Sequence, residues 1–468
     1  MSGQVNYQQI GDTYYMPGTS SFFNVAVSKD SNTIIYFDCF NLLGYVYERN
    51  LQTESAFYEK TSTFHTVDGV PGFELINSNL NLAVSYDASI VITGLENTNI
   101  GAAFIFKRNN TGFYNQLGSK LSQPIFKTHI TFFGWQISCN LDCSVFSVSA
   151  PSQDDYGGVV YIYGLNGDSV SLMGELPYFR KDSGFGFTNV AINGAGTYLM
   201  VEGRSFSNKT SVVLSFTHEK NGWTELTPLI NKAEEDDYFG SALAINQAGD
   251  VVVVGDNRGS WIYKKSRTSW NLVTSLLPND LKLNTAYSYA QSLAMNDVGD
   301  VVAVSATGAG SGTMWVFSYN RKKWIQDGSK ITSKDTSISS IGYSMSMNSD
   351  GSILVASATS LAPLHYGAFV VFQKTMQVSG CMPNPTAKEK QCRKMIKMCN
   401  KKHHIKMKFI QESCPGVSGE SGCQCDQFCG YSCEQACDHD IQCYWANNQC
   451  YNKFTNLPGQ SIQTCPVF

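Results

Sequence analysis

Cysteine is the residue whose chemistry stands out first in this sequence. Of 15 cysteines, three precede residue 380 and twelve lie in the last 88 residues. An even and dense set in so short a segment predicts a framework of six disulfides, because a small unit cannot bury enough apolar surface to fold unaided. The twelve are Cys381, Cys392, Cys399, Cys414, Cys423, Cys425, Cys429, Cys433, Cys437, Cys443, Cys450 and Cys465.

Zinc is the alternative use of these thiols. The segment has no C-x-x-C pair, and its histidines, His403, His404 and His439, do not stand at zinc-finger spacing. The spacing therefore favours disulfides, and we expect neither a metal nor another cofactor.

Two further cysteines, Cys139 and Cys143, flank a tight turn earlier in the chain. A local disulfide fits this geometry, and two free thiols are the alternative. Cys39 then has no partner, and we expect it to act as a small apolar residue.

A basic stretch lies inside the cysteine-rich segment, at residues 388–408. It reads either as a solvated helix face fixed by Cys392 and Cys399, or as a patch for an anionic partner. The patch residues are Arg393, Lys394, Lys397, Lys401, Lys402, Lys406 and Lys408.

Other candidate sites are few. Asp154 and Asp155 are weak candidates for holding a cation in a long loop, and a solvated loop is the favoured explanation. Asn109 and Asn208 begin N-x-T sequons, which matter only in a secretory route. Zinc-protease, serine-hydrolase, P-loop and dinucleotide motifs are absent from the sequence, so no catalytic residue is predicted.

The elements that must position these residues follow a repeat. An alternating apolar strand, a small polar turn and a strong β run recur seven times, with the turns starting at Ser28, Ser85, Asn140, Asn193, Asn246, Asn296 and Asn348. The steps between turns are 57, 55, 53, 53, 50 and 52 residues. Such regularity indicates one supersecondary unit per repeat.

Each unit predicts a four-stranded sheet. The second strand is almost continuously apolar, as in residues 251–254, and a glycine-rich loop leads to a third strand rich in aromatics. A strand marked by Trp or Tyr closes most units. Four strands in each of seven units predict an all-β, seven-bladed β-propeller over residues 1–375. A linker at 376–380 would lead to a disulfide-rich domain at 381–468.

The closing of this ring is also predicted. The seventh unit lacks a fourth strand, whereas residues 5–12 match the fourth strands at residues 113–119 and 324–329. We therefore expect the N-terminal strand to pair with residues 369–373 and to remove the open sheet edge.

The units resemble FG-GAP repeats, the propeller repeats of integrin α chains. The "FG" residues are Phe133-Gly134, Phe185-Gly186 and Phe239-Gly240, and residues 148–151 followed by Gly157-Gly158 stand at the "GAP" position. The resemblance implies an extracellular type of propeller. Integrin-type calcium loops are not matched, since the turns here are short and poor in carboxylates.

Composition excludes several classes of protein. Charged residues are 15% of the chain and the net charge is −4, which argues against a disordered polyelectrolyte and against nucleic acid as partner. No apolar run is long enough for a transmembrane helix, and the first twenty residues lack the pattern of a signal peptide.

The sequence as a whole predicts a non-enzymatic recognition or structural protein that binds a protein or glycan through its propeller loops. Disulfides without a leader suit the virion surface or capsid of a large DNA virus that supplies its own thiol oxidase. The alternatives are a secreted or cell-surface adhesion protein or lectin, and a propeller-type glycosidase or lyase.

Overall fold

A computed structural model of the chain describes residues 4–16, 23–38, 41–50, 57–68, 82–95, 101–124, 131–151, 158–177, 183–205, 211–220, 222–229, 239–267, 269–280, 289–307, 312–360, 367–377, 443–446 and 449–452. Every regular element in these residues is a β-strand. The chain divides into two compact units, Tyr7–Gln373 and a second unit that joins Met1–Asn6 to Lys374–Phe468.

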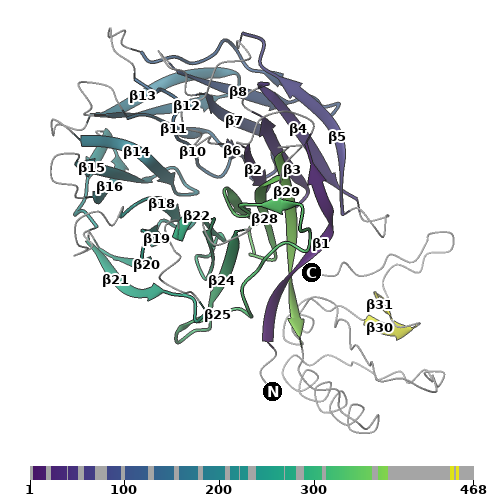
Figure 1. The fold of residues 1–468 in the computed structure, drawn as a ribbon. Coiled ribbons are helices and arrows are strands. Elements are labelled where there is room, and N and C mark those ends of the chain that lie inside the picture. The colour runs from purple at the N-terminus through teal and green to yellow at the C-terminus, as the bar shows by residue number, and fades with distance from the viewer. Residues whose placement is uncertain are drawn as a thin grey trace, which may run out of the picture. The chain divides into compact units, whose positions relative to one another are not determined.

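The first unit consists of seven antiparallel sheets, as predicted (Figure 1). Blade 1 is β2 (Phe23–Val27), β3 (Thr33–Asp38), β4 (Leu43–Arg49) and β5 (Tyr58–His65). Blade 2 is β6 (Leu82–Val84), β7 (Ile90–Leu95), β8 (Ala102–Arg108) and β9 (Tyr114–Gln116). Blade 3 is β10 (Ile137–Cys139), β11 (Val145–Ala150), β12 (Val159–Asn166) and β13 (Ser169–Pro177).

The remaining blades repeat this order. Blade 4 is β14 (Ser183–Ile192), β15 (Tyr198–Ser205), β16 (Ser211–Glu219) and β17 (Gly222–Glu225). Blade 5 is β18 (Ala242–Ile245), β19 (Val251–Gly255), β20 (Ser260–Ser266) and β21 (Ser269–Leu276). Blade 6 is β22 (Tyr289–Met295), β23 (Val301–Ala306), β24 (Thr313–Tyr319) and β25 (Trp324–Gln326). Blade 7 is β26 (Ile338–Ser339), β27 (Met345–Met347), β28 (Ile353–Ser360), β29 (Gly367–Gln377) and β1 (Gln4–Tyr15).

The first strands of the blades contact one another in a closed circle. The order is β2, β6, β10, β14, β18, β22, β27 and again β2. The second strands are buried along both faces, as β3 and β23 are over their whole length, because each blade lies between two neighbours. This burial is why the second strands are mainly apolar on both faces instead of alternating between apolar and polar residues.

The predicted closure of the ring is confirmed, since β1 forms the outer strand of blade 7 beside β29. The Tyr7 hydroxyl donates to the carbonyl of Gly351 in the first turn of that blade. Tyr58 and Tyr114 donate in the same way to Ser31 and Ala88 in blades 1 and 2. The N-terminal strand thus makes the contact that an internal fourth strand makes.

A Gln-x-Gly motif is a second feature that β1 has in common with the internal fourth strands. The Gln9 amide donates to Gly11 at 3.4 Å, and its carbonyl accepts from Lys334 N at 3.2 Å in the preceding linker. Gln116 and Gln326 bond in the same pattern in blades 2 and 6. Gly11, Gly118 and Gly328 share φ values of 67°, 67° and 68°, a conformation that glycine adopts without strain.

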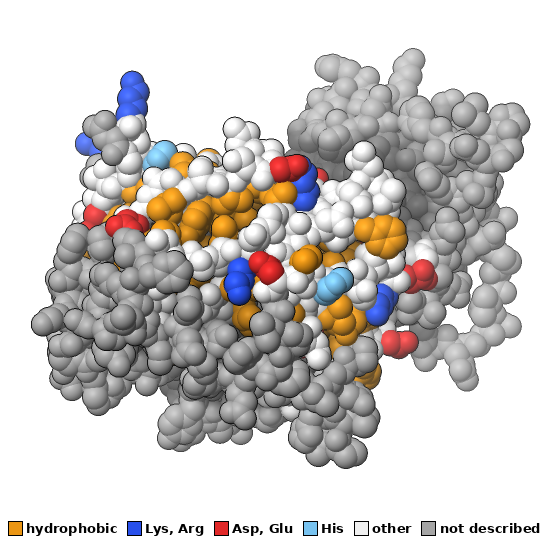
Figure 2. All heavy atoms as spheres, turned by 90° about the horizontal axis from the view of Figure 1, so that it is seen from above, with side chains coloured by type: hydrophobic (Ala, Val, Ile, Leu, Met, Phe, Trp, Pro, Cys, Tyr) orange, Lys and Arg blue, Asp and Glu red, His pale blue; other side chains and the backbone are white. Residues whose placement is uncertain are grey.

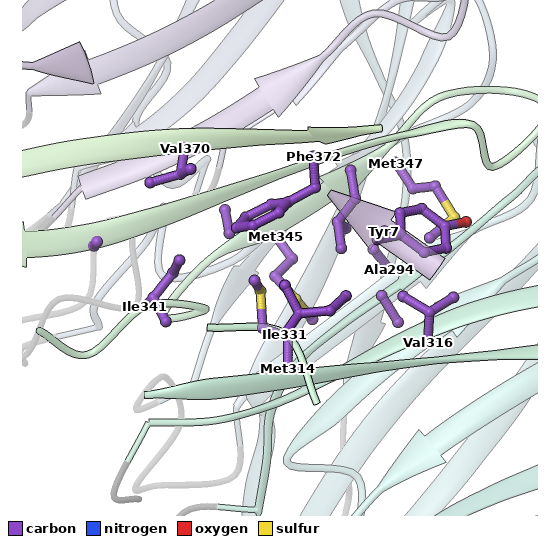
Figure 3. Packing of buried hydrophobic residues seen from close by; sticks show 14 of the residues in the cluster. Tyr7, Ala294, Met314, Val316, Ile331, Ile341, Met345, Met347, Val370 and Phe372 are labelled. Carbon is purple, nitrogen blue, oxygen red and sulfur yellow. The ribbon is translucent and has the colours of Figure 1, made fainter. Parts of the chain in front are cut away.

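Figure 3 shows how β1 completes the core between blades 6 and 7. Tyr7 packs among Ala294, Val316 and Met347, in a buried cluster that continues through Met345 to Phe372. Removing β1 would expose this cluster to water, so the closing strand contributes burial of apolar surface as well as hydrogen bonds.

The fourth strands alternate between two forms, which sequence analysis did not predict. In blades 1, 3 and 5 they have eight, nine and eight residues and contain one bulge each. In blades 2, 4 and 6 they have three, four and three residues and are followed by isolated bridges, Ala103 to Leu121, Val213 to Leu229 and Met314 to Ile331. The blades therefore recur in pairs around most of the ring.

The second unit has one described antiparallel hairpin, β30 (Cys443–Ala446) with β31 (Gln449–Asn452). The disulfide framework expected between residues 381 and 468 lies outside the described residues apart from the backbone of this hairpin, and it stays a prediction.

Candidate interaction surface at the turn end

The same hydrogen bond occurs in each of the seven turns that join a first strand to a second strand. The side-chain oxygen of the first turn residue accepts the backbone N–H five positions later, over 2.7 to 2.9 Å. The acceptor is a serine in blades 1 and 2 and an asparagine in blades 3 to 7. Short polar side chains at this position satisfy backbone groups that the reversal of the chain leaves unpaired.

The N–H four positions later is satisfied in two ways. In blades 4, 5 and 6 the same asparagine oxygen accepts it. In blades 1, 2, 3 and 7 an aspartate at the third turn position accepts it, at 2.9 to 3.0 Å: Asp30, Asp87, Asp142 and Asp350. The two forms of turn occupy separate halves of the ring.

Neighbouring turns are bonded to each other around the whole circle, which we call the turn ring. Six junctions have a backbone bond: Asp30 N to Tyr86 O (3.3 Å), Tyr86 N to Leu141 O (2.7 Å), Leu141 N to Gly194 O (3.0 Å), Gln247 N to Asp297 O (3.0 Å), Asp297 N to Ser349 O (3.0 Å) and Ser349 N to Lys29 O (2.9 Å). At the junction of blades 4 and 5 the Asn193 amide donates to Gln247 O at 3.3 Å.

Charged groups reinforce the ring where blades 6, 7 and 1 meet. Lys29 Nζ lies 3.1 Å from Asp297 Oδ1 and donates to the carbonyl of Met347 at 3.3 Å. Ser349 Oγ donates to Asp297 Oδ2 at 2.7 Å. One lysine therefore ties three blades together beside the point where the ring closes.

The outward tips of the turns form the surface of this end of the propeller, the turn end. The third turn residue is Asp30, Asp87, Asp142 or Asp350 in blades 1, 2, 3 and 7, but Ala195, Ala248 or Val298 in blades 4, 5 and 6. Val298 is 68% exposed, and Tyr86 beside Asp87 is 42% exposed. The third turn position is thus acidic in blades 7, 1, 2 and 3 and apolar in blades 4, 5 and 6. In blades 5 and 6 the nearby carboxylates are taken up within the turns: Asp250 and Asp300 accept from Asn246 and Asn296, and Asp297 is largely buried beside Lys29.

Two of the four tip aspartates, Asp87 and Asp142, have a pKa below the usual value for aspartate. Partial burial acts to raise the pKa of Asp87, but hydrogen bonds from Ser89 and Ser85 outweigh it and lower that pKa below its usual value. Asp142 shows the same balance: burial raises its pKa, and hydrogen bonds from Ser144 lower it further than burial raises it. Both carboxylates accept hydrogen bonds in their charged form.

The FG residues have a structural role in the blades. The Gly134 N–H donates to the carbonyl of Ser149, the serine of the "GAP" position, at 3.0 Å. Gly240 and Gly342 make the matching bonds at 2.9 Å. A Cβ on Gly134 would lie 2.1 Å from the Ala102 carbonyl in the preceding blade, and its φ is +91°, so this close approach requires glycine.

Of the residues singled out from the sequence, Cys139 and Cys143 lie together and form a disulfide across the blade 3 turn. Cys143 takes the positive-φ position that glycine holds in blades 4 to 7. Asn109 is exposed at the tip of the β8–β9 turn, where its Oδ1 accepts from the Thr111 hydroxyl at 2.6 Å.

The other predicted site residues, namely Asp154, Asp155, Asn208, Cys39 and the basic stretch from Arg393 to Lys408, lie outside the described residues. Among the residues that are described, no group of His, Cys, Asp and Glu is arranged to hold a metal ion. No helix in the described part of the chain is long and apolar enough to cross a membrane.

The division of the turn end was missed from the sequence, although its signal was present. The letters after each marker are S-x-D or N-x-D in blades 1, 2, 3 and 7 and N-x-A or N-x-V in blades 4 to 6. Only the ring of bonds shows that these positions lie side by side.

No family model matches this sequence, and no curated protein matches it. Similar solved structures include the β-propeller domain of Cps50 (Swd1) from Myceliophteria thermophila, which is 8% identical, with 78% of this chain and 98% of that chain covered and a TM-score of 0.49.

Two others are described as lactonases. A putative 6-phosphogluconolactonase from Bacteroides fragilis is 10% identical, with 77% and 91% of the two chains covered and a TM-score of 0.46. The periplasmic gluconolactonase of Pseudomonas aeruginosa is 12% identical, with 70% and 98% covered and a TM-score of 0.46. At such low identity these similarities concern the β-propeller fold alone.

Proposed function

We propose that this chain is a non-enzymatic recognition and structural protein that binds a protein partner at the turn end of its propeller. The observation that carries the proposal is the division of the turn tips into an acidic side and an apolar side. The tips sit on a closed ring of hydrogen bonds, so they are held in fixed positions and lose little freedom on binding.

The division indicates the chemistry of the partner. Four aspartates in adjacent blades favour lysine and arginine side chains, and the tips Ala195, Ala248 and Val298 favour an apolar area next to them. A protein surface offers both, which is why we place a protein ahead of a glycan. A second contact, of an anionic partner with the basic stretch of residues 388–408, belongs to the same proposal.

The setting that we propose is an oxidising one, on the surface of a virion or outside a cell. The support is the Cys139–Cys143 disulfide together with twelve cysteines in the last 88 residues. The FG and GAP residues are compatible with a propeller of the integrin α type, and this resemblance remains part of the proposal.

Intact mass after thiol alkylation tests the setting. We expect natively purified protein to resist alkylation at twelve or more cysteines until it is reduced. Free alkylation of most thiols would contradict the oxidising setting and leave the binding proposal to its own test.

Site-specific photo-crosslinking tests the partner. A photoreactive residue at Ala248 or Val298 should capture a protein in the native source, and one at Lys60 on the rim of blade 1 should not. Replacing Asp87 and Asp142 by Asn keeps a hydrogen-bond acceptor in each turn and removes two charges. The double variant should bind the captured protein about tenfold more weakly, and its binding should depend less on salt. Equal capture at Lys60, or unchanged binding by the Asn variant, would refute a turn-end site.

A further inference from the structure

The fourth strands of blades 1, 3 and 5 have a bulge at the same position, but the side chains at this bulge differ in polarity. Across the bulges, Tyr47 pairs with Lys60, Tyr163 with Leu172 and Tyr263 with Leu272. The bulged residue that follows is Thr61 in blade 1, Met173 in blade 3 and Val273 in blade 5. The bulge stands at the same position of the register in the three blades, so blade 1 serves as an internal control.

Blades 3 and 5 expose apolar side chains at these positions. Leu172 and Met173 are 45% and 42% exposed, and Leu272 and Val273 are 52% and 51% exposed. Blade 1 has the exposed polar residues Lys60 and Thr61 in their place, so the fold does not require apolar residues there. Figure 2 shows hydrophobic side chains gathered on part of the rim face that it views.

The two apolar sites lie on hairpins of opposite charge. The blade-3 hairpin, residues 159–177, has the carboxylates Asp168 and Glu175 and no basic residue. The blade-5 hairpin, residues 260–276, has Lys264, Lys265 and Arg267 and no acidic residue. Asp168 is paired with Lys107 at 2.5 Å and Lys265 packs over the Tyr198 ring, which leaves Glu175 and the exposed Lys264 and Arg267 for contacts outside the molecule.

We propose that the blade-3 hairpin of one molecule docks against the blade-5 hairpin of a second copy of this chain. Each hairpin offers an apolar pair at the same bulge, and their charges are complementary. Since both hairpins belong to every molecule and differ from each other, the contact is head-to-tail and leaves one free site at each end. This goes beyond the proposed function, because self-association needs no outside partner.

The bulges fix the manner of contact. An extra residue in an edge strand interrupts regular pairing with a further strand, so the two edges do not form one continuous sheet. The contact therefore rests on the projecting side chains, which is why substitutions of these side chains test it.

Sedimentation velocity of the oxidised full chain, with free thiols alkylated, tests the proposal over about a hundredfold range of concentration. The wild type should associate as concentration rises. Leu172→Lys with Met173→Thr, and separately Leu272→Lys with Val273→Thr, give each hairpin the residues of blade 1 and should require at least about tenfold more protein to associate. Lys60→Ala with Thr61→Ala is the matched control and should behave as wild type.

A mixture of the two variants provides the sharpest outcome. Each retains one intact hairpin, so the mixture should form a one-to-one dimer and stop there. A wild type that stays monomeric, variants that associate as well as wild type, or a mixture that forms no dimer would overturn the proposal. Glu175→Lys adds a test independent of the apolar positions, since it should weaken association and reduce its dependence on salt.

Discussion

The turn ring and the rim of the propeller differ in how closely their repeats agree. At the turn ring, each of the seven turns contains the same hydrogen bond, and its length varies only from 2.7 to 2.9 Å. At the rim, fourth strands vary from three residues in β9 to twelve in β1, and the exposed side chains change from Lys60 to Leu172 at matched positions. Repetition is strict where blades bond to each other and loose where each blade meets solvent.

The comparison teaches where this fold can carry function. A change in one turn disturbs two neighbouring blades, because each turn is bonded to the next. A change at an exposed position of an outer strand, such as Lys60 or Leu172, leaves the bonds of the turn ring in place. Surfaces on the tips and the rim can therefore diverge while the ring is kept, which is why we place both proposed contacts on tips and outer strands.

Deleting residues 1–12 should give the largest effect, because it removes the outer strand of blade 7 and exposes the cluster around Tyr7. We expect the melting temperature to fall by several degrees in a thermal unfolding scan. Deletion of residues 1–3, which precede β1, is the control and should change little. An unchanged melting curve for the longer deletion would mean that β1 does not hold the ring closed.

Replacing Asn296 by Ser tests the two forms of turn. Ser at this position can accept from Val301 N–H, as Ser28 does in blade 1, but it leaves Asp300 N–H without its acceptor. We expect a loss of about 1–2 kcal/mol in the free energy of unfolding, measured in urea.

The added substitution Val298→Asp rebuilds the Ser-x-Asp turn of blades 1 and 2 and should recover most of that loss. If Asn296→Ser costs nothing, or if the double variant is no better than the single one, the two turn forms are not equivalent solutions to the same bonding problem.

Replacing Gln9, Gln116 and Gln326 by Ala, one at a time, tests whether β1 behaves as an internal strand. Each glutamine hydrogen-bonds to the glycine two residues after it and to the linker that precedes its blade. Each replacement should therefore lower the free energy of unfolding by about 0.5–1.5 kcal/mol. Gln116 also donates to the Asp68 carboxylate at 2.7 Å, so its variant should lose the most, and the Gln9 and Gln326 variants should show similar losses in the same urea titration. A negligible loss at Gln9 alone would separate β1 from the internal strands.

Acid should weaken one contact of β1 by a small amount. Hydrogen bonds from Ser337 and Tyr15 lower the pKa of Asp335 from 3.8 to about 2. A carboxylate with a lowered pKa stabilises the fold above pH 4 and loses that contribution as pH falls towards 2.

The wild type should therefore melt slightly higher than Asp335→Asn at pH 5, and the two should converge by pH 2. A difference that is constant with pH would show that ionisation of Asp335 plays no part. The contact is exposed to solvent, which is why the effect should be the smallest of the four.

The sequence predicted the ring through its markers. The residue type and spacing of markers such as Asn140 and Asn246 predict the turns. The similarity of residues 5–12 to residues 113–119 predicts the strand that completes blade 7. The alternation of outer strands was not predictable in this way, because Met173 and Val273 become bulged residues only through the register of β13 and β21. The tips were missed for a similar reason, since Asp87 and Ala248 are far apart in sequence and share a surface only through the ring.

The position of β1 at the start of the chain also determines when, during translation, the ring can close. Tyr7 is made near the start of translation, yet its partner Gly351 follows 344 positions later. At about 5–20 residues per second, the interval is roughly 20 to 70 s. During that interval β1 is an unpaired edge beside a growing series of blades, so the ring can lock only when nearly the whole propeller has left the ribosome. A chain truncated before blade 7 would keep both edges open, and open strand edges promote association with other chains.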